Sequence, residues 1–492
     1  MKPTPASNLL PCAALLRGAD TSLTEQLAAR FADPIRQRLM SAGARLPSVR
    51  ECARKHGVSA STVVAAYDQL LAQGLVEARK QRGFYVRETR ITSAAQARQR
   101  DTANTANPAS AALLPPPLSA TALVRGMFQP PGSLPMPGLG SLPVDWLDLP
   151  LLSTALKRVT AGALLGPLSL QYGEPTGDMR LRRALSVHLS DLGVSAEPAQ
   201  IITTLGAIHA LDVVTRSLLS AGDCVLVDEP GWPVEFARLA AMGLRVLPVP
   251  RSEAGPDLAV MQKHIDANRA NPPRLYITVS VMHNPTGASL SLAAAHRVLE
   301  LAKRNNLHIV EDDTYAYLAP QHLPRLAALD SLERTIYISG FSKILAPNWR
   351  VGFVAAPPHL TERFVDTKLL TTLTTPSITE QALAHCLENG LLRRHAERVT
   401  LRLDAARARA VKLAEAHGCT FAAPPRGLFG WVDVGADTER LARVMSEAGW
   451  LLAPGSLFHA TPRPTSLMRI NFATTQEARF WKALSSARDG LR

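Results

Sequence analysis

The sequence lacks the features that mark several classes of protein. Only five cysteines occur in 492 residues and no two form a CxxC pair, which argues against a structural zinc site and against a disulfide framework. No long apolar run is present, so a membrane-spanning helix is not expected. The apolar patch at residues 9–16 is interrupted by Pro11, and Lys2 is the only positive side chain before it. We therefore expect no signal peptide, a cytoplasmic location and no bound metal.

Acidic residues are outnumbered by basic ones. The chain has 41 Asp and Glu against 54 Lys and Arg, a net charge of +13. The excess is concentrated early, since residues 1–90 hold fourteen basic and seven acidic side chains. Such a balance fits a partner that carries phosphate. The length exceeds that of one typical domain and suggests two or three.

The first periodic pattern begins near residue 23. Leu23, Leu27, Phe31 and Ile35 recur every four residues, as expected of a helix that buries one face. Pro34 is expected to end or kink this helix.

Two further helices are expected around a short turn. Ser48 can cap the first, Gly57 can end it, and Ser59 can cap the next. Two helices joined by such a turn form a helix-turn-helix, whose second helix can lie in the major groove of DNA. Residues 76–86 read as a hairpin wing. The residues predicted to contact DNA are Arg45, Ser48, Arg50, Ser59, Ser61, Thr62, Arg79, Lys80 and Arg82.

These elements match a known pattern over residues 18–88, the predicted first domain. The match rests on five strings: RLPSVR at 45–50, GVS at 57–59, TV at 62–63, AY at 66–67 and GFYV at 83–86. Together they resemble the winged helix-turn-helix of GntR-type regulators. Cys52, Ser61 and Arg82 depart from the usual Leu, Arg and small residue, and the lost arginine bears on the operator sequence and not on binding. The alternative is a helical domain with a solvated basic face, or a winged helix that binds protein.

The rest of the chain divides into a linker and a large domain. Residues 89–140 are rich in Ala, Ser, Thr, Asn and Pro, which predicts a flexible linker with stiffer proline stretches. Within residues 141–492, helical stretches alternate with short apolar runs such as 224–227 and 275–279. This alternation predicts an α/β fold with a mostly parallel sheet, whose ligands lie at the carboxyl ends of the strands.

Polar residues that follow these runs match the needs of pyridoxal 5′-phosphate. Lys343 is placed to condense with the cofactor aldehyde, and Asp312 to keep the pyridine nitrogen protonated. Asn284 and Tyr315 would hydrogen-bond the phenolic oxygen of the ring. Trp232 would stack on its face.

The phosphate and a substrate carboxylate need further donors. Backbone amides at a helix start and an arginine fork suit the phosphate, and the predicted phosphate-end residues are Gly206, Ala207, Ile208, Ser342 and Arg350. Arg469 is predicted to bind a substrate carboxylate. Two alternatives stay open: Asp313 could be the pyridine partner in place of Asp312, and Arg469 could form a structural ion pair.

The large domain resembles the fold type I aminotransferases. In that family the position of Tyr172 reaches a phosphate across the dimer interface, and the resemblance implies catalytic roles for Lys343, Asp312 and Tyr315. Gly340 stands where a hydroxyl residue is usual, and polar residues common after Gly206 are replaced by apolar ones. The phosphate is therefore expected to depend more on Arg350, Tyr172 and backbone amides.

A GntR-type head, a linker and an aminotransferase-like body together resemble the MocR family of bacterial transcription regulators. The resemblance implies a homodimer, arranged head-to-tail, that binds double-stranded DNA. It also implies that pyridoxal phosphate, or an amino compound forming an imine with it at Lys343, acts as effector. The alternative is a catalytically active aminotransferase with a secondary DNA-binding head, and the sequence leaves turnover open.

Overall fold

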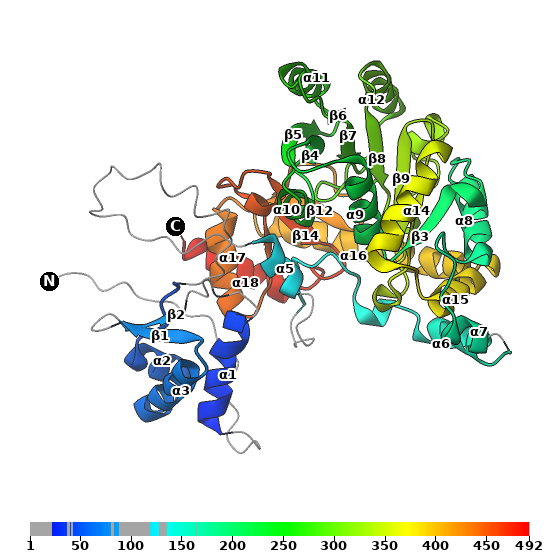
Figure 1. Cartoon of the computed structure of the whole chain (residues 1–492). Coiled ribbons are helices and arrows are strands. Elements are labelled where there is room, and N and C mark those ends of the chain that lie inside the picture. The colour runs from blue at the N-terminus through cyan, green and yellow to red at the C-terminus, as the bar shows by residue number, and fades with distance from the viewer. Residues whose placement is uncertain are drawn as a thin grey trace. The chain divides into compact units, whose positions relative to one another are not determined.

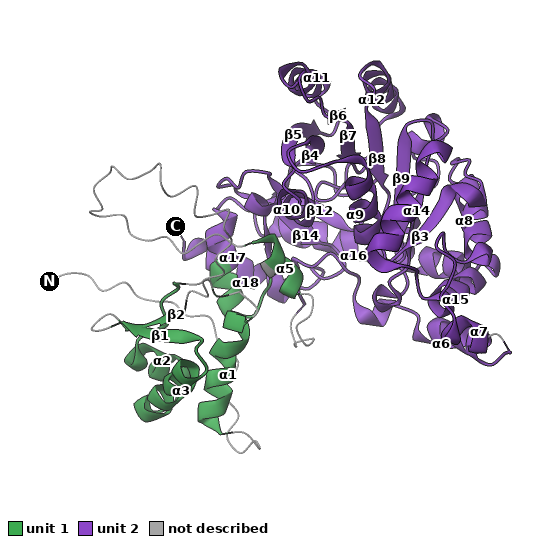
Figure 2. Cartoon of the chain, in the orientation of Figure 1, with its two compact units in different colours: residues 1–134, 443–451 green, residues 135–442, 452–492 purple. Residues whose placement is uncertain are grey.

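The computed structural model folds into two compact units (Figure 1, Figure 2). The first unit comprises residues 1–134 with 443–451, and the second comprises residues 135–442 with 452–492. The structure describes residues 22–36, 40, 43–79, 83–87, 119–126, 135–163 and 165–491.

The first unit contains the predicted helix-turn-helix and wing. Its elements are α1 (Leu23–Arg36), α2 (Val49–His56), α3 (Ala60–Ala72), the antiparallel hairpin β1 (Val76–Arg79) and β2 (Gly83–Val86), and α5 (Ala120–Gly126). The Ser48 hydroxyl caps α2 by accepting from the Glu51 amide at 3.3 Å. Helix α1 runs through Pro34 to Arg36, so Pro34 does not end it. Pro34 has no amide hydrogen to donate, so the last turn of α1 lacks one intrahelical hydrogen bond.

The core of this unit is apolar and continuous. Residues from all three helices and both strands of the wing form it: Leu27, Phe31, Ile35, Leu46, Cys52, Val63, Tyr67, Leu70, Val76 and Val86. The rings of Phe31 and Phe84 each contact Tyr67 edge-on, with centroids 5.7 and 5.0 Å away. The Tyr67 hydroxyl donates to Pro47 O at 2.9 Å, which ties α3 to the segment before α2.

The second unit is built on a mixed sheet, whereas the sequence predicts a mostly parallel one. Among the described residues the strand order is β3-β10-β9-β8-β7-β4-β5-β6. Strands β4, β5, β7, β8 and β9 run parallel, whereas β10 is antiparallel to both of its neighbours and β6 is antiparallel to β5. The bounds are β3 (Ile201–Thr204), β4 (Cys224–Glu229), β5 (Arg245–Ser252), β6 (Gly255–Pro256), β7 (Leu275–Thr278), β8 (His308–Asp312), β9 (Thr335–Gly340) and β10 (Gly352–Ala355).

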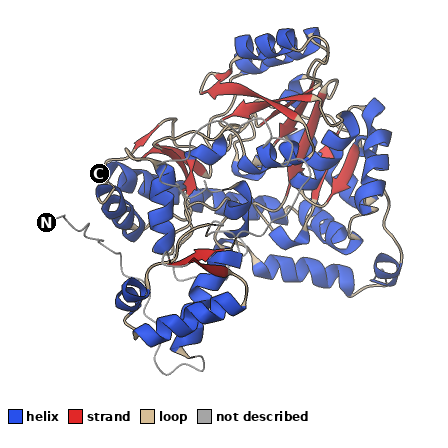
Figure 3. Ribbon diagram, turned by 60° about the vertical axis from the view of Figure 1, so that its left-hand side comes forward, coloured by secondary structure: helices blue, strands red, loops and turns tan. Residues whose placement is uncertain are grey.

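Helices cover both faces of this sheet (Figure 3). Successive strand residues point to opposite faces, so Val225 and Val227 pack with α9, α10 and α14, whereas Leu226 packs with α11, α12 and α13. These helices are α9 (Ala207–Leu218), α10 (Pro233–Ala241), α11 (Leu258–Ala267), α12 (Leu292–Arg304), α13 (Leu326–Leu329) and α14 (Pro358–Thr372).

A smaller antiparallel sheet has the order β11-β12-β14-β13. Its strands are β11 (Thr420–Phe421), β12 (Phe429–Asp433), β13 (Ala453–Pro454) and β14 (Leu467–Asn471). The remaining helices are α6 (Leu149–Thr160), α7 (Leu165–Leu170), α8 (Met179–Asp191), α15 (Ser377–Glu388), α16 (Leu391–Ala416), α17 (Thr438–Glu447) and α18 (Ala478–Asp489).

The described residues also bear on the linker and on membranes. Within the predicted linker, residues 120–126 form α5 and residues 135–140 belong to the second unit, while most of the linker lies outside the described residues. The domain boundaries therefore stay predictions. In the described parts of the chain, no helix combines the length and apolarity that crossing a membrane would need.

Candidate cofactor site and nucleic-acid interface

Three consecutive carboxylates close strand β8, and the strand alternation separates them. Glu311 is buried and accepts from the amides of Leu326 and Ala327, both at 2.8 Å. Asp313 is also buried, forms a 2.7 Å ion pair with Arg325 and accepts from the Tyr337 hydroxyl at 2.8 Å. Both carboxylates therefore already have partners within the protein.

Asp312 lies on the opposite side of the strand. Its Oδ1 accepts from the amide of Thr314 at 3.0 Å and from the hydroxyl of the same residue. No ion pair holds it among the residues that the structure describes. Burial first, and then the charges of Glu235 and Asp313, raise the pKa of Asp312 to about 6. A carboxylate in such surroundings suits a cationic partner, which favours Asp312 over Asp313 as the pyridine ligand.

Lys343 lies in the turn that follows β9. A Cβ built on Gly140 would be 3.7 Å from its Nζ and 3.8 Å from Nη1 of Arg469, so the lysine and the arginine border one small space. Burial first, then the positive charge of Arg469, lowers the pKa of Lys343 to about 8, while Asp312 opposes this shift. The amine is thus more readily available as a nucleophile than an ordinary lysine.

Arg469 on β14 is buried and joins the two sheets. Its Nη1 donates to Asn284 Oδ1 at 2.9 Å, and its guanidinium lies 4.4 Å from the ring centroid of Phe429 and 5.2 Å from that of Phe458. Burial lowers the pKa of Arg469 to about 10. The Tyr315 ring meets Phe429 edge-on at 5.4 Å. The structure thus brings together three of the predicted site residues, Asn284, Tyr315 and Arg469. No carboxylate pairs with Arg469 among the described residues.

At the predicted phosphate end, the backbone of Gly206 lies close to the Arg350 side chain and to the backbone of Gly352. Gly206 has φ +83° and caps α9, and a Cβ on it would lie 2.8 Å from Arg350 Nη2. A Cβ on Gly352 would lie 2.6 Å from the Gly206 carbonyl carbon. Arg350 donates to Leu205 O at 2.8 Å and to the Ser342 hydroxyl at 3.3 Å. Only glycine allows this packing, which gathers a guanidinium, a hydroxyl and a helix N-terminus.

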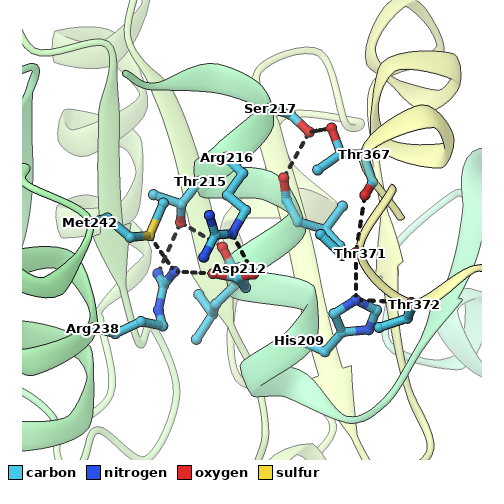
Figure 4. A network of polar contacts seen from close by, with 12 residues as sticks. His209, Asp212, Thr215, Arg216, Ser217, Arg238, Met242, Thr367, Thr371 and Thr372 are labelled. Atoms are coloured by element: carbon cyan, nitrogen blue, oxygen red, sulfur yellow. Dashed lines mark hydrogen bonds and ion pairs between the residues drawn. The ribbon is translucent and has the colours of Figure 1, made fainter. Parts of the chain in front are cut away.

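His209 is a supporting residue that sequence reasoning missed. Its Nδ1 accepts from the Leu205 amide at 3.0 Å, so the ring proton is on Nε2, which lies 3.4 Å from the Thr371 hydroxyl and 3.3 Å from the Thr372 hydroxyl (Figure 4). Burial first, then Lys368, lowers the pKa of His209 to about 4, so the imidazole is neutral. The ring ties the turn before Gly206 to α14.

The rest of α9 is held from two sides (Figure 4). Arg238 on α10 donates to the Thr215 hydroxyl at 2.9 Å and lies 3.6 Å from an Asp212 carboxylate oxygen. The hydroxyls of Ser217 and Thr367 are 2.7 Å apart, which links α9 to α14. These contacts fix the position of the helix whose N-terminus belongs to the predicted phosphate end.

Replacing His209 by alanine is expected to weaken pyridoxal phosphate retention about fivefold, because one buried hydrogen bond of about 1 kcal/mol that positions Leu205 is lost. Cofactor affinity is measured by fluorescence titration of the apoprotein. His322→Ala, which removes an exposed histidine, is the matched control and should bind like the parent. Equal affinity of the two variants would show that His209 does not position the turn.

Several predicted residues are placed less directly. Trp232 caps α10 after β4 and is partly buried, but no measured contact joins it to Lys343. Ala207 and Ile208 begin α9, with Ile208 pointing to solvent. Tyr172 is 83% exposed and is not joined to this site within its own chain. Ser339 donates to Asp313 O at 2.8 Å, so its hydroxyl is turned away from Arg350.

The helix-turn-helix presents a hydroxyl cluster at the start of α3. Ser59 Oγ accepts from the Thr62 amide at 3.1 Å and lies 2.7 Å from the hydroxyls of both Ser61 and Thr62. On the wing, Arg79 pairs with Glu77 at 2.8 Å and lies over the Tyr85 ring at 4.5 Å.

The other predicted DNA contacts surround these elements. Ser48 and Arg50 are exposed at the start of α2. The backbone of Arg45 forms an antiparallel β-bridge with Tyr85, and its side-chain Nε is 3.5 Å from a Cβ built on Gly83. Arg45 therefore lies alongside β2 of the wing. Lys80 and Arg82 lie outside the described residues. The structure thus places hydroxyl groups at a helix N-terminus, and the same unit carries exposed basic side chains, a combination that suits a phosphate backbone.

No three His, Cys, Asp or Glu side chains come together as a metal site within the described residues. The four described cysteines, Cys52, Cys224, Cys386 and Cys419, are buried, and no disulfide joins any two of them.

Fold and site together define an α/β domain of the aminotransferase type joined to a winged helix-turn-helix. Residues 141–486 match the family described as aminotransferase class I and II. Residues 23–86 match the bacterial regulatory proteins of the gntR family.

Similar regulators cover most of the chain. The HTH-type transcriptional regulator YisV of Bacillus subtilis is 26% identical over 480 residues, covering 93% of this chain and 94% of that relative. A protein described as the rhizopine catabolism regulatory protein MocR, from Rhizobium meliloti, is 30% identical over 78% of this chain and 75% of its own length. Among solved structures, the α-aminoadipate aminotransferase LysN of Thermus thermophilus, complexed with N-(5'-phosphopyridoxyl)-L-leucine, superposes with a TM-score of 0.67 at 25% identity, covering 75% of this chain and 95% of that one.

The chain belongs to the aminotransferase class I and II family and, within it, to the MocR-like regulators, in which a GntR-type head precedes an aminotransferase domain. Both the resemblance and the fold class predicted from the sequence are confirmed.

Proposed function

We propose that the chain is a DNA-binding transcription regulator whose large domain binds pyridoxal phosphate at Lys343 and senses the cofactor or an amino compound there. One observation carries the proposal: the chain combines a winged helix with a site that gathers a partly buried lysine, two arginines and a carboxylate that has no cationic partner among the described residues. These groups fit the cofactor. When bound, pyridoxal phosphate supplies an aldehyde carbon for amines and a ring that withdraws electrons.

Each group would hold a different part of the cofactor. Lys343 would bind the aldehyde carbon, and Asp312 would keep a proton on the pyridine nitrogen. Asn284 and Tyr315 would donate to the phenolic oxygen, and Trp232 would cover one ring face. The phosphate would be bound by the remaining residues, namely Gly206, Ala207, Ile208, Ser342 and Arg350, with Tyr172 from a second copy. The 83% exposure of Tyr172 supports such a contribution in a head-to-tail homodimer.

The effector side of the site would be Arg469. Its buried guanidinium faces Lys343 and carries no carboxylate partner in the part of the chain that the structure describes. An amino compound bearing a carboxylate would therefore satisfy both Lys343 and Arg469. The ligand would bias one conformation of the large domain, and that bias would change DNA binding.

DNA binding by the head is tested by neutralising basic residues of the wing and by measuring how affinity depends on salt concentration. Neutralising Arg79, Lys80 and Arg82 to glutamine should weaken binding of the full chain to every DNA sequence and reduce the salt slope by up to about three, because each lost phosphate contact releases about one counterion fewer. Ser61→Ala should instead change the preference among sequences, since Ser61 is exposed at the recognition-helix N-terminus. Binding is measured by fluorescence anisotropy on a randomised pool and on selected duplexes.

Arg269→Gln is the control for this experiment, because Arg269 is a highly exposed arginine of the second unit. It should leave both affinity and salt slope unchanged. Salt-independent binding, or the absence of binding to any sequence in the pool, would remove the regulator proposal.

A second candidate function is turnover as an aminotransferase. The retention of Lys343, Asp312 and Arg469 around one space favours it, because these groups are those that amino-group transfer requires. Transamination rates measured beside DNA affinity separate the two proposals.

A further inference from the structure

The chain enters the second unit through a short segment that lies against Arg469. We call residues 135–141 the entry segment, of which Pro137 and Gly138 are buried. Arg469 Nη2 donates to Gly138 O at 2.6 Å. Two residues further along this segment, a Cβ built on Gly140 would lie 3.7 Å from Lys343 Nζ, so the backbone of Gly140 borders the space beside the lysine. Main chain therefore lines the space beside the lysine and occupies one donor of the arginine.

Asn471 fastens the same segment. Its Nδ2 donates to Leu139 O at 3.0 Å and to Ser141 O at 2.7 Å, and its amide donates to Pro137 O at 3.1 Å. Asn471 is two residues beyond Arg469 on β14. Strand β14 thus carries Arg469 and also the asparagine that fastens the entry segment.

A ligand carboxylate could replace the Gly138 carbonyl as the acceptor for Arg469. The guanidinium uses Nη1 for Asn284 and Nη2 for Gly138, and its buried Nε has no hydrogen-bond partner. A carboxylate accepts two parallel bonds from a guanidinium, and such charge-assisted bonds are about twice as strong as those to a neutral carbonyl. A carboxylate that reaches Arg469 therefore outcompetes the carbonyl of Gly138.

Building on the proposed function, we propose that the entry segment is an internal competitor for Arg469. The carboxylate of an amino-acid-like effector takes the guanidinium from Gly138, and residues 135–141 are released. Along the chain this segment is the last stretch before the large domain, following the residues that come from the DNA-binding head. Its release lengthens the tether of the head, so effector binding is passed to the DNA-binding domain through the chain itself.

Two matched probes test this proposal on the full-length protein loaded with pyridoxal phosphate. Aminooxyacetate and methoxyamine both condense with the cofactor aldehyde, but only aminooxyacetate carries a carboxylate. Hydrogen exchange is followed at two amides that report on the segment: Leu139, which donates to Met136 O at 3.1 Å, and Asn471, which donates to Pro137 O. Aminooxyacetate should accelerate their exchange about tenfold, since charged-group hydrogen bonds of this kind hold the segment closed. Methoxyamine should leave it unchanged.

Absorbance of the cofactor is recorded in the same samples. If both probes change the absorbance and neither changes exchange, or both change it equally, the competitor proposal is overturned while the cofactor site stands. If neither probe changes the absorbance, the proposed function fails and the competitor proposal fails with it.

A variant provides an independent reading. Asn471→Ala removes the two side-chain bonds to the segment and leaves Arg469 in place, so aminooxyacetate should react at about threefold lower concentration while methoxyamine is unaffected. An equal shift for both probes would contradict the proposal. Should this variant fold poorly, the exchange measurement on the unaltered protein decides the question.

Discussion

Lys343→Ala should abolish the covalent attachment of pyridoxal phosphate while the protein keeps its fold. After borohydride reduction, mass spectrometry should find the pyridoxyl group on Lys343 in the parent protein and on no lysine in the variant. The physical reason is that the charges of Asp312 and Arg469, the two groups that suit the ring and the ligand, both act on this amine. Because Lys343 is only partly buried, truncation leaves no large cavity.

Lys368 is the matched control, since it is a second lysine of this unit whose burial lowers its pKa to about 8. Its Nζ lies 3.4 Å from the Thr203 hydroxyl, and its charged neighbours are Glu380 and Arg182, away from Asp312. Lys368→Met should therefore keep the label. A reduced adduct on Lys368, or on any lysine other than Lys343, would show that the site is assigned wrongly.

The pH dependence of cofactor uptake follows from the same pKa. Only the neutral amine attacks an aldehyde, so the rate of uptake by the apoprotein should rise with pH and level off near the lowered pKa of Lys343, about 8, instead of near 10.5. Arg469→Gln should move the plateau to higher pH, because it removes a positive charge that lowers this pKa.

Asp312→Asn and Asp313→Asn should have opposite signatures. Asp312→Asn should weaken pyridoxal phosphate binding by about 10- to 100-fold, the worth of a hydrogen bond to a charged group. It should not lower the thermal stability of the apoprotein, because burial raises the pKa of this carboxyl to about 6 and its ionised form is unfavourable near neutral pH.

Asp313→Asn should instead destabilise the protein by about 3 kcal/mol, because it leaves the fully buried Arg325 without its charge partner. The folded fraction should still bind the cofactor normally. Thermal unfolding gives the stability of each variant, and cofactor titration gives its affinity for pyridoxal phosphate. If Asp313→Asn proves the more damaging to cofactor affinity in folded protein, Asp313 and not Asp312 is the pyridine partner.

Features that depend on residues close together in the chain could be predicted from the sequence. The caps at Ser48 and Ser59 and the apolar spacing of α1 and α3 depend on neighbours within one turn, so the helix-turn-helix could be predicted. The apolar runs likewise predicted the strands of the large sheet. Pro34 shows the limit of a local rule, since the packing of Ile35 in the core holds the last turn of α1 beyond it.

What the sequence could not predict are contacts between distant segments. The bond from Arg469 to Gly138 joins residues 331 positions apart, and His209 meets Thr371 across 162 positions. Phe429 gave no signal either, because a lone phenylalanine before an apolar strand reads as core. The choice between Asp312 and Asp313 required knowing which face of β8 each side chain occupies, and that depends on the register of the neighbouring strands.

The site is divided between two sheets. Lys343 and Arg350 lie on the short connection from β9 to β10 in the large sheet, whereas Arg469 belongs to β14 in the small antiparallel one. The two residues proposed to anchor the cofactor therefore belong to one sheet, and the residue proposed to bind a ligand carboxylate belongs to the other. In the proposed site a ligand would be held by its amine at the large sheet and by its carboxylate at the small one, so the number of carbons between its two ends, more than its side chain, would set the distance that it can bridge between the sheets.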